Sequence, residues 1–357
     1  MYQVIIGSAD GMDDYVITEN YINHETLGQI TIRKQGEVLV GYENGQFKYS
    51  MIISIDHGNK QIKTVHKTFV SGLSVSEVRP ALGEGCLHWN GKYYTLSGSR
   101  LPYRRDKTTD ESFFVLTLFG IAYEILNANA YAAEQTTSVD LLVGLPPAHY
   151  GALYQKFEQY FNRGTVQYSF DGQPFSIYFN SVTAYPQAYA AAMTVFGQLR
   201  QLPKCVVVDI GGFTSDYMLL KNGAPDMASC SSLEHGVIVL YNRIIMAVNS
   251  AYDLLLDETD IDAALRGQNG LLSDAIVQSI HQQAQDFSED LFSQLRERMI
   301  DLRAAQTVFV GGGASLLRPF LERSPKVGKC LFVEELNANA RGYEMLYRVQ
   351  AAAKGGR

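Results

Sequence analysis

Hydrophobic and polar positions alternate with two different periods along the chain, and their order predicts strands interspersed with helices. Short apolar runs that end in an acid, MIISID at 51–56 and CVVVDI at 205–210, are typical of buried strands. The segment 108–134 is apolar on nearly all sides and too long for a strand, so it predicts a buried helix. Thr108 and Glu111 have the spacing of a capping box at the start of that helix.

The two halves of the chain repeat one order of elements. Each begins with a strand, an acid and a glycine turn, and continues with paired strands, a long helix, a strand and a helix. This order predicts an α/β fold with two similar domains, 51–200 and 201–335, that face each other across a cleft. Residues 257–303 are helical and polar-faced in pattern, which indicates an insertion or subdomain, and 336–357 predict a C-terminal helix that packs on the first domain.

Residues 1–50 have a different pattern from the rest of the chain. Alternating runs at 28–50 and the dipeptide Asn44-Gly45, which favours a tight hairpin turn, predict a small β-rich extension.

Composition and charge narrow the classes of protein. A chain of 357 residues with 46% hydrophobic residues suits two globular domains. With a net charge of -7, the chain is a poor candidate for direct binding to a nucleic-acid backbone. The most basic stretch, at 99–107, is interpreted as a solvated loop. The longest apolar run is too short to span a membrane. Four widely spaced cysteines indicate reduced thiols, and the N-terminus lacks the pattern of a signal peptide, so we expect a cytoplasmic protein.

Two related motifs carry the candidate chemistry. In IDHGNKQIK at 55–63, Asp56 ends a strand before a glycine turn, and in VDIGGFTSD at 208–216, Asp209 does the same. A glycine turn lets backbone N–H groups converge on an anion. An acid beside it makes sense if Mg²⁺ lies between the acid and a phosphate, with water still on the metal. Either turn alone occurs in many hairpins. Two copies in matching places of the two halves predict a site that binds a polyphosphate from both sides, where Lys63 could neutralise charge on the phosphates.

Two further segments have weaker signals. Gly311, Gly312 and Gly313 stand between a strand and a helix, where a flat ligand can approach the backbone, although neither a Walker A loop nor GxGxxG is present. Pro186 suits the first turn of a helix, which would place Gln187 at the helix start. A glutamine there can hold a water for in-line attack on a phosphate, although by itself it is an ordinary residue at the start of a helix.

Taken in order, these motifs resemble the actin/sugar-kinase/chaperone ATPase superfamily and, within it, the ParM/StbA family of plasmid-segregation actins. IDHGNKQIK resembles its first phosphate loop, DIGGFTSD the second, VGGGASLL the adenosine loop and YPQAYAA the connecting segment. The resemblance spans 51–347 and implies the actin-like ATPase fold, with two βββαβα domains that flank a nucleotide cleft. Family members begin at the strand that starts here with Met51. Residues 1–50 are therefore either a genuine appendage or lie upstream of the true start.

The resemblance also implies roles for individual residues. Asp56 and Asp209 would hold Mg²⁺ through water, and Gln187 would orient the attacking water. Some ParM proteins carry Glu at this place, whereas eukaryotic actin carries Gln, as this chain does. This leaves open whether the residue is a base or only positions the water. The residues implied to bind the nucleotide are Gly58, Asn59, Lys60, Lys63, Gly211, Gly212, Phe213, Thr214, Gly311, Gly312, Gly313 and Ala314.

The function implied is that of an ATPase that forms dynamic filaments with ATP and Mg²⁺. Such filaments would move plasmid or other mobile-element DNA through a DNA-bound adaptor protein, with no direct contact to DNA or membrane. Two alternatives stay open: a non-polymerising actin-like scaffold, and a small-molecule kinase of the same superfamily. No motif marks the residues that contact the base, so the choice between ATP and GTP is not predicted.

Overall fold

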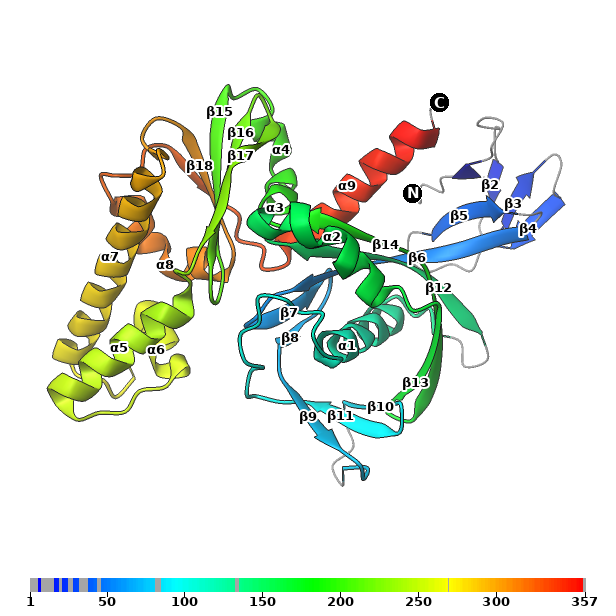
Figure 1. Cartoon of the computed structure of the whole chain (residues 1–357), viewed down its shortest axis with the longest axis horizontal. Coiled ribbons are helices and arrows are strands. Elements are labelled where there is room, and N and C mark those ends of the chain that lie inside the picture. Colours follow the sequence, from blue (N-terminus) through cyan, green and yellow to red (C-terminus); the bar gives the residue numbers. More distant parts are fainter. Residues whose placement is uncertain are drawn as a thin grey trace.

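The computed structural model of the chain places two α/β halves side by side, each with its own sheet and core (Figure 1). It describes residues 6–7, 16–18, 21–24, 28–31, 38–43, 46–80, 85–131, 135–268 and 270–355.

The first half is built on a sheet whose central strands run in the order β8-β7-β6-β12-β14. The first three of these pair antiparallel, and β6, β12 and β14 pair parallel. The bounds are β6 Gln46–His57, β7 Gln61–Thr64, β8 Thr68–Val70, β12 Thr136–Leu145 and β14 Gln173–Pro186.

The second half repeats this order and these directions. Its sheet runs β17-β16-β15-β18-β19, with antiparallel pairs among the first three strands and parallel pairs among the last three. The bounds are β15 Lys204–Ile210, β16 Ser215–Lys221, β17 Ala224–Leu233, β18 Gln306–Val310 and β19 Cys330–Phe332. The repeated architecture predicted from the sequence is therefore confirmed.

Further strands extend the first sheet on both sides. Beyond β14 come β13 (Thr165–Phe170), β10 (Cys86–Trp89), β11 (Lys92–Leu96) and β9 (Leu73–Ser76). On the other side, β5 (Val38–Glu43) pairs with the first part of β6, and β1 (Ile6–Gly7) pairs with β5. A separate small sheet contains β2 (Val16–Thr18), β3 (Tyr21–His24) and β4 (Gly28–Thr31). These strands agree with the predicted β-rich extension, while Asn44-Gly45 lie outside the described residues.

Helices cover one face of each sheet (Figure 1). On the first sheet, α1 (Ser112–Asn127) and α2 (Pro147–Phe161) bury aromatic side chains against β6 and β12. The second core is closed by α5 (Val237–Tyr252), α6 (Glu258–Leu265), α7 (Asp274–Glu297) and α8 (Gly312–Arg323). The helices predicted within 257–303 are thus observed.

The remaining helices lie between the two sheets. These are α3 (Tyr189–Met193), α4 (Phe196–Leu199) and α9 (Ala338–Gly355). In α3, Ala191 and Ala192 pack in one cluster with Val207 and Val308 of the second sheet. In α9, Tyr343 packs in another cluster with residues of the first sheet. The chain crosses from one half to the other at these helices, so they join the two halves.

Three local predictions are wrong. Helix α1 begins at Ser112, and no capping box forms, because Thr108 donates its hydrogen bond to Asp106 and Glu111 pairs with Arg163. The sequence QIKTVHKTF at 61–69 predicts one strand, but the segment is split into β7 and β8 by a turn that Thr64 stabilises through the backbone N–H of Lys67. Pro186 ends strand β14 instead of opening a helix.

The contact between α9 and α3 depends on Gly342. A Cβ added there would lie 1.8 Å from the carbonyl oxygen of Ala190, and backbone atoms of packed helices cannot move aside. We expect Gly342→Ala to lower the free energy of unfolding by about 1–3 kcal/mol, as overpacking typically does. Thermal melts followed by circular dichroism measure the change. Gly151→Ala on α2, where a Cβ meets no atom within 4 Å, is the control and should be neutral or slightly stabilising. Equal melting temperatures for the two variants would contradict the prediction.

Candidate active site

A cavity of about 240 Å³ lies between the two halves and is lined by residues from both sheets. It brings together nearly all the predicted site residues: Asp56, Gly58, Asn59, Lys60, Lys63, Gln187, Asp209, Gly211, Gly212, Phe213, Thr214, Gly311, Gly312 and Gly313. Ala314 is the exception, because its side chain is buried in the core of the second half and does not line the cavity.

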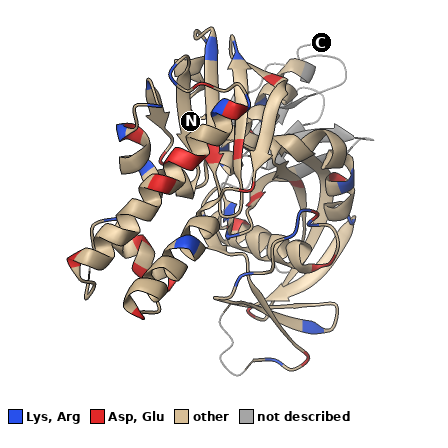
Figure 2. Ribbon diagram, turned by 60° about the vertical axis from the view of Figure 1, so that its left-hand side comes forward, with Lys and Arg blue, Asp and Glu red and all other residues tan. Residues whose placement is uncertain are grey.

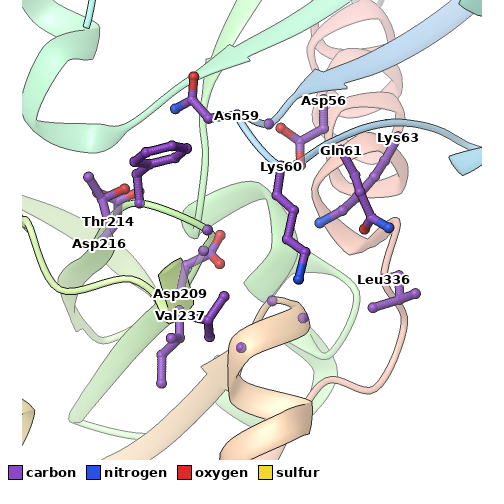
Figure 3. Close-up of a pocket in the computed structure, with 18 of the residues that line it drawn as sticks. Asp56, Asn59, Lys60, Gln61, Lys63, Asp209, Thr214, Asp216, Val237 and Leu336 are labelled. Atoms are coloured by element: carbon purple, nitrogen blue, oxygen red, sulfur yellow. The ribbon is translucent and has the colours of Figure 1, made fainter. Parts of the chain in front are cut away.

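The two acids occupy equivalent places in the two sheets. Asp56 lies next to the end of β6 and Asp209 next to the end of β15, which are the central strands of the two equivalent orders. Both carboxylates are buried and enter the same cavity from opposite halves (Figure 3). Burial raises the pKa of Asp209, and the charge of Asp56 adds to this, while Lys63 and a hydrogen bond from Asn339 act in the opposite direction.

The second glycine turn is fixed by the start of α5. The backbone N–H groups of Val237 and Ile238 donate to the carbonyl oxygens of Gly211 and Gly212, at 3.1 and 2.9 Å. Gly211 uses its own N–H for the carbonyl of Thr214, at 2.8 Å, so it is not available to a ligand. In the described part of the chain, the N–H groups of Gly212 and Phe213 donate to no protein acceptor. The turn therefore keeps two adjacent donors for an anion.

The two turns approach each other closely at Gly212. A Cβ added to Gly212 would lie 2.9 Å from the Cβ of Lys60 in the first turn. A Cβ on Gly311 would lie 2.4 Å from Oδ1 of Asp209, and Gly311 has a φ of 91°, which favours glycine. Gly212 and Gly311 thus allow the first glycine turn, the second glycine turn and the loop before α8 to meet around one cavity.

Gln187 contacts the first acid directly. Its Nε2 donates to Oδ1 of Asp56 at 2.6 Å, and its side chain is buried. It does not start a helix as predicted. Ala188 has φ 60° and ψ -54°, and the N–H of Tyr189 donates to the carbonyl of Gln187 at 2.6 Å. These values define a classic γ-turn, a rare and strained conformation.

Two residues of the site were missed by sequence reasoning. Asn339, at the start of α9, touches both acids. Lys107 is buried and donates to the carbonyl of His57, so the basic stretch at 99–107 is not simply a solvated loop. Burial lowers the pKa of Lys107 to about 8, against the opposite effect of Asp56 and Asp216. Neither residue belongs to the four motifs that predicted the site.

Asp216, which also lines the cavity, was quoted in the second motif but not assigned to the site. Burial raises its pKa to about 7, with a further contribution from Asp209, although Ser232 donates a hydrogen bond to it. Below that pH the folded chain keeps a proton on Asp216, whereas an unfolded chain releases it near pH 3.8. The contribution of Asp216 to stability is therefore greatest below pH 3.8 and falls as the pH rises to about 7.

The variant Asp216→Asn tests this shift because asparagine cannot ionise. We expect its free energy of unfolding, relative to wild type, to rise between pH 3.8 and about 7 and then to level off. Denaturant midpoints at a series of pH values measure the difference. A difference that stays constant over this range would show that Asp216 ionises as an exposed acid does.

A group of polar contacts joins the two halves at the mouth of the cavity, and we call it the latch. Lys60 of the first half donates to the hydroxyl of Tyr241 at 2.9 Å and lies 3.4 Å from Glu258 Oε2. Arg100, also of the first half, lies 2.6 Å from Glu258 Oε1. Tyr241 in turn donates to Asp262 at 2.5 Å. Every side chain of the second half in this group belongs to α5 or α6.

Figure 2 shows Lys and Arg interspersed with Asp and Glu over the helices and strands in that view. Within the described ranges, no helix is both long enough and apolar enough to cross a membrane.

Comparisons with known proteins agree with this architecture. Residues 207–323 match the family model described as archaeal actin homologue MreB-like, C-terminal. No curated protein matches the chain by sequence.

Solved structures match over nearly their whole length. A ParM filament structure from Clostridium botulinum has a TM-score of 0.66 at 18% identity, covering 84% of this chain and 99% of that one. The archaeal actin homologue Ta0583, in complex with ADP, has a TM-score of 0.65 at 17% identity, with coverage of 84% and 99%. The apo structure of the pSK41 ParM protein has a TM-score of 0.63 at 16% identity, with coverage of 86% and 99%. The chain therefore has the actin-like fold of these ParM proteins and of the archaeal actin homologue, and the predicted fold is confirmed.

Proposed function

We propose that the cavity binds ATP with Mg²⁺ and hydrolyses it, and that the nucleotide controls assembly of the chain into filaments. The observation that carries this proposal is the meeting of two acid–glycine turns, from equivalent places in two sheets, in one cavity. Among the structures with this fold, Ta0583 is described in complex with ADP and a Bacillus thuringiensis ParM with ATP.

The residues present fit a polyphosphate with a divalent cation. Three lysines, Lys60, Lys63 and Lys107, line the same cavity as Asp56 and Asp209. The unused N–H groups of the second turn supply anion donors, and Oδ1 of Asn59 in the first turn is buried without a partner. Carboxylates, together with waters that the ion retains, are the ligands that Mg²⁺ prefers.

Each group then has a definite task. Asp56 and Asp209 would hold Mg²⁺ through water, and the bound ion would neutralise charge on the transferred phosphate. The glycine turns and Lys63 would bind the phosphate oxygens. Gln187 has its Nε2 held by Asp56. This orients the amide oxygen to accept a hydrogen bond from the attacking water, which is the positioning that phosphoryl transfer needs.

The filament part of the proposal rests on the related structures. Both the Clostridium botulinum ParM and Alp12 are described as filaments. We propose that this chain likewise assembles into filaments when ATP is bound and disassembles after hydrolysis. The task that follows for such a filament is segregation of plasmid or other mobile-element DNA through a DNA-bound adaptor protein in the cytoplasm.

Right-angle light scattering combined with pelleting tests the proposal on the full chain. Parallel samples receive Mg-ATP, a non-hydrolysable analogue or ADP, and phosphate release is followed in each. Scattering that rises with Mg-ATP, decays as phosphate appears and persists with the analogue would support a dynamic filament. Binding of ATP without assembly would favour a scaffold. Turnover that rises when a sugar or a small acid is added would favour a kinase.

A further inference from the structure

Asn339 links parts of the cavity that come from both halves. It lies in the first turn of α9 and is 8% exposed. Its Nδ2 is 3.0 Å from Oδ2 of Asp209 and 3.5 Å from Oδ2 of Asp56. Its Oδ1 accepts the backbone N–H of Ala188 at 3.0 Å. One side chain from the C-terminal helix thus contacts the acids of both halves and the turn that follows Gln187.

The chemistry of these partners fixes the orientation of the amide. A backbone N–H can only donate, so the atom of Asn339 that faces Ala188 is the oxygen. Ionised carboxylates can only accept, so the NH₂ group faces Asp56 and Asp209. All three contacts agree with one orientation, and a flipped amide would lose each of them.

The contact with Ala188 lies at a strained place. Ala188 has the dihedral angles of a classic γ-turn and is fully buried. Such conformations persist only where surrounding contacts determine them, and they cluster at functional sites. The backbone N–H of Ala188 donates a hydrogen bond to Oδ1 of Asn339. This contact stabilises the γ-turn directly after Gln187.

A second route leads from Asn339 to the same glutamine. Asp56 accepts from Gln187 Nε2 on one oxygen and faces Asn339 Nδ2 with the other. The position of Asp56 therefore depends on Asn339, and the orientation of the Gln187 amide depends on Asp56. Asp209 attaches this arrangement to the second half through the same NH₂ group.

We propose that Asn339 is a positioning residue for hydrolysis, which fixes Gln187 through both the γ-turn and Asp56 and so aligns the attacking water. The inference rests on the proposed function, because it concerns the rate of ATP hydrolysis at that site. Asn339, which lies on the C-terminal helix 283 positions from Asp56 in the sequence, thereby joins the residues that determine the rate of ATP hydrolysis.

A double-mutant cycle on the full chain tests the inference. The variants are Asn339→Ala, Gln187→Ala and the pair, with kcat and the affinity for Mg-ATP measured for each. We expect Asn339→Ala to lower kcat by about 10- to 100-fold, the size of effect that misplacing a reacting group produces. The affinity for Mg-ATP should change less than about 3-fold, because the lost contacts are not made to the nucleotide. In the Gln187→Ala background, Asn339→Ala should have little further effect on kcat, since its partner is already gone.

Asn337→Ala is the matched control. Asn337 lies just before α9 and donates to the carbonyl of Val65, away from both acids. Its loss removes one contact to the first half and none to either acid, so kcat should stay unchanged. If Asn339→Ala fails to fold, Asn339→Leu takes its place in the cycle with the same expectation, because leucine has nearly the same size, adds no charge beside the acids and can neither donate to them nor accept from Ala188.

The outcomes separate this inference from the proposed function. A wild-type chain that hydrolyses no ATP would overturn both. If the wild type hydrolyses ATP while the Asn339 variant keeps the kcat of the Asn337 control, the inference alone is overturned. It is also overturned if the losses of Asn339→Ala and Gln187→Ala simply add, because that would show that Asn339 does not act through Gln187.

Discussion

Replacing Asp209 with alanine is expected to abolish Mg-dependent ATP hydrolysis. Asp209 is buried beside the second glycine turn. The NH₂ group of Asn339 contacts both Asp209 and Asp56 of the first half. Removal of Asp209 takes away one of the two carboxylates proposed to hold the metal. A bound metal contributes several kcal/mol to the transition state, so we expect a loss of at least about 10³-fold in kcat. Phosphate release measured against Mg²⁺ concentration checks this.

The control for Asp209→Ala is an acid of the same sheet that lies away from the cavity. Asp226 on β17 pairs with Lys221 at 2.7 Å and does not line the cavity. Asp226→Ala should keep the wild-type rate. Near-normal hydrolysis by Asp209→Ala, in a chain that is still folded by circular dichroism, would show that the metal site has been assigned to the wrong residues.

The second large effect is expected for Gln187→Ala. This variant keeps both carboxylates and both glycine turns, so ATP should still bind with an affinity close to that of the wild type. Loss of the group that orients the water should lower kcat by about 10²-fold, within the range for a positioned side chain. Because hydrolysis is proposed to release the filament, its polymers should also live longer. Phosphate release and light scattering on the same sample measure both effects.

A size-matched variant sharpens this test. Gln187→Glu would place a second carboxylate where the amide now donates to Asp56 at 2.6 Å. Two like charges at this distance repel, so the variant should also bind Mg-ATP differently, whereas Gln187→Ala should not. If Gln187→Ala hydrolyses ATP at the wild-type rate, the water-positioning role is wrong.

The central features of the fold were predictable because their signals are local. A fully apolar run, an acid and a glycine turn occur within a few residues, and the two copies at Asp56 and Asp209 indicated two equivalent sheets and a shared cavity. The hairpin at Asn90-Gly91 is of the same kind, and both residues have the positive φ that its turn requires.

The features that were missed depend on contacts between distant segments. Asn339 lies 130 positions from Asp209 in the sequence, and nothing in its neighbourhood distinguishes it from an ordinary residue at a helix start. The γ-turn at Ala188 has no local signal, because alanine rarely adopts a positive φ and is held there by its surroundings. The capping box at Thr108 was wrong for the same reason: Glu111 instead forms an ion pair with Arg163.

The latch has a consequence for how the cavity is entered. Lys60 carries a single ammonium group, and both Tyr241 and Glu258 of the opposite half already hold it. A phosphate that drew this ammonium inward would leave Glu258 with Arg100 alone and the hydroxyl of Tyr241 with Asp262 alone. The ligand and the opposite half therefore compete for one cation. Under the proposed function, a phosphate in the cavity would therefore replace part of the latch with a contact inside the cavity, and the bound phosphates would themselves help to hold the two halves together.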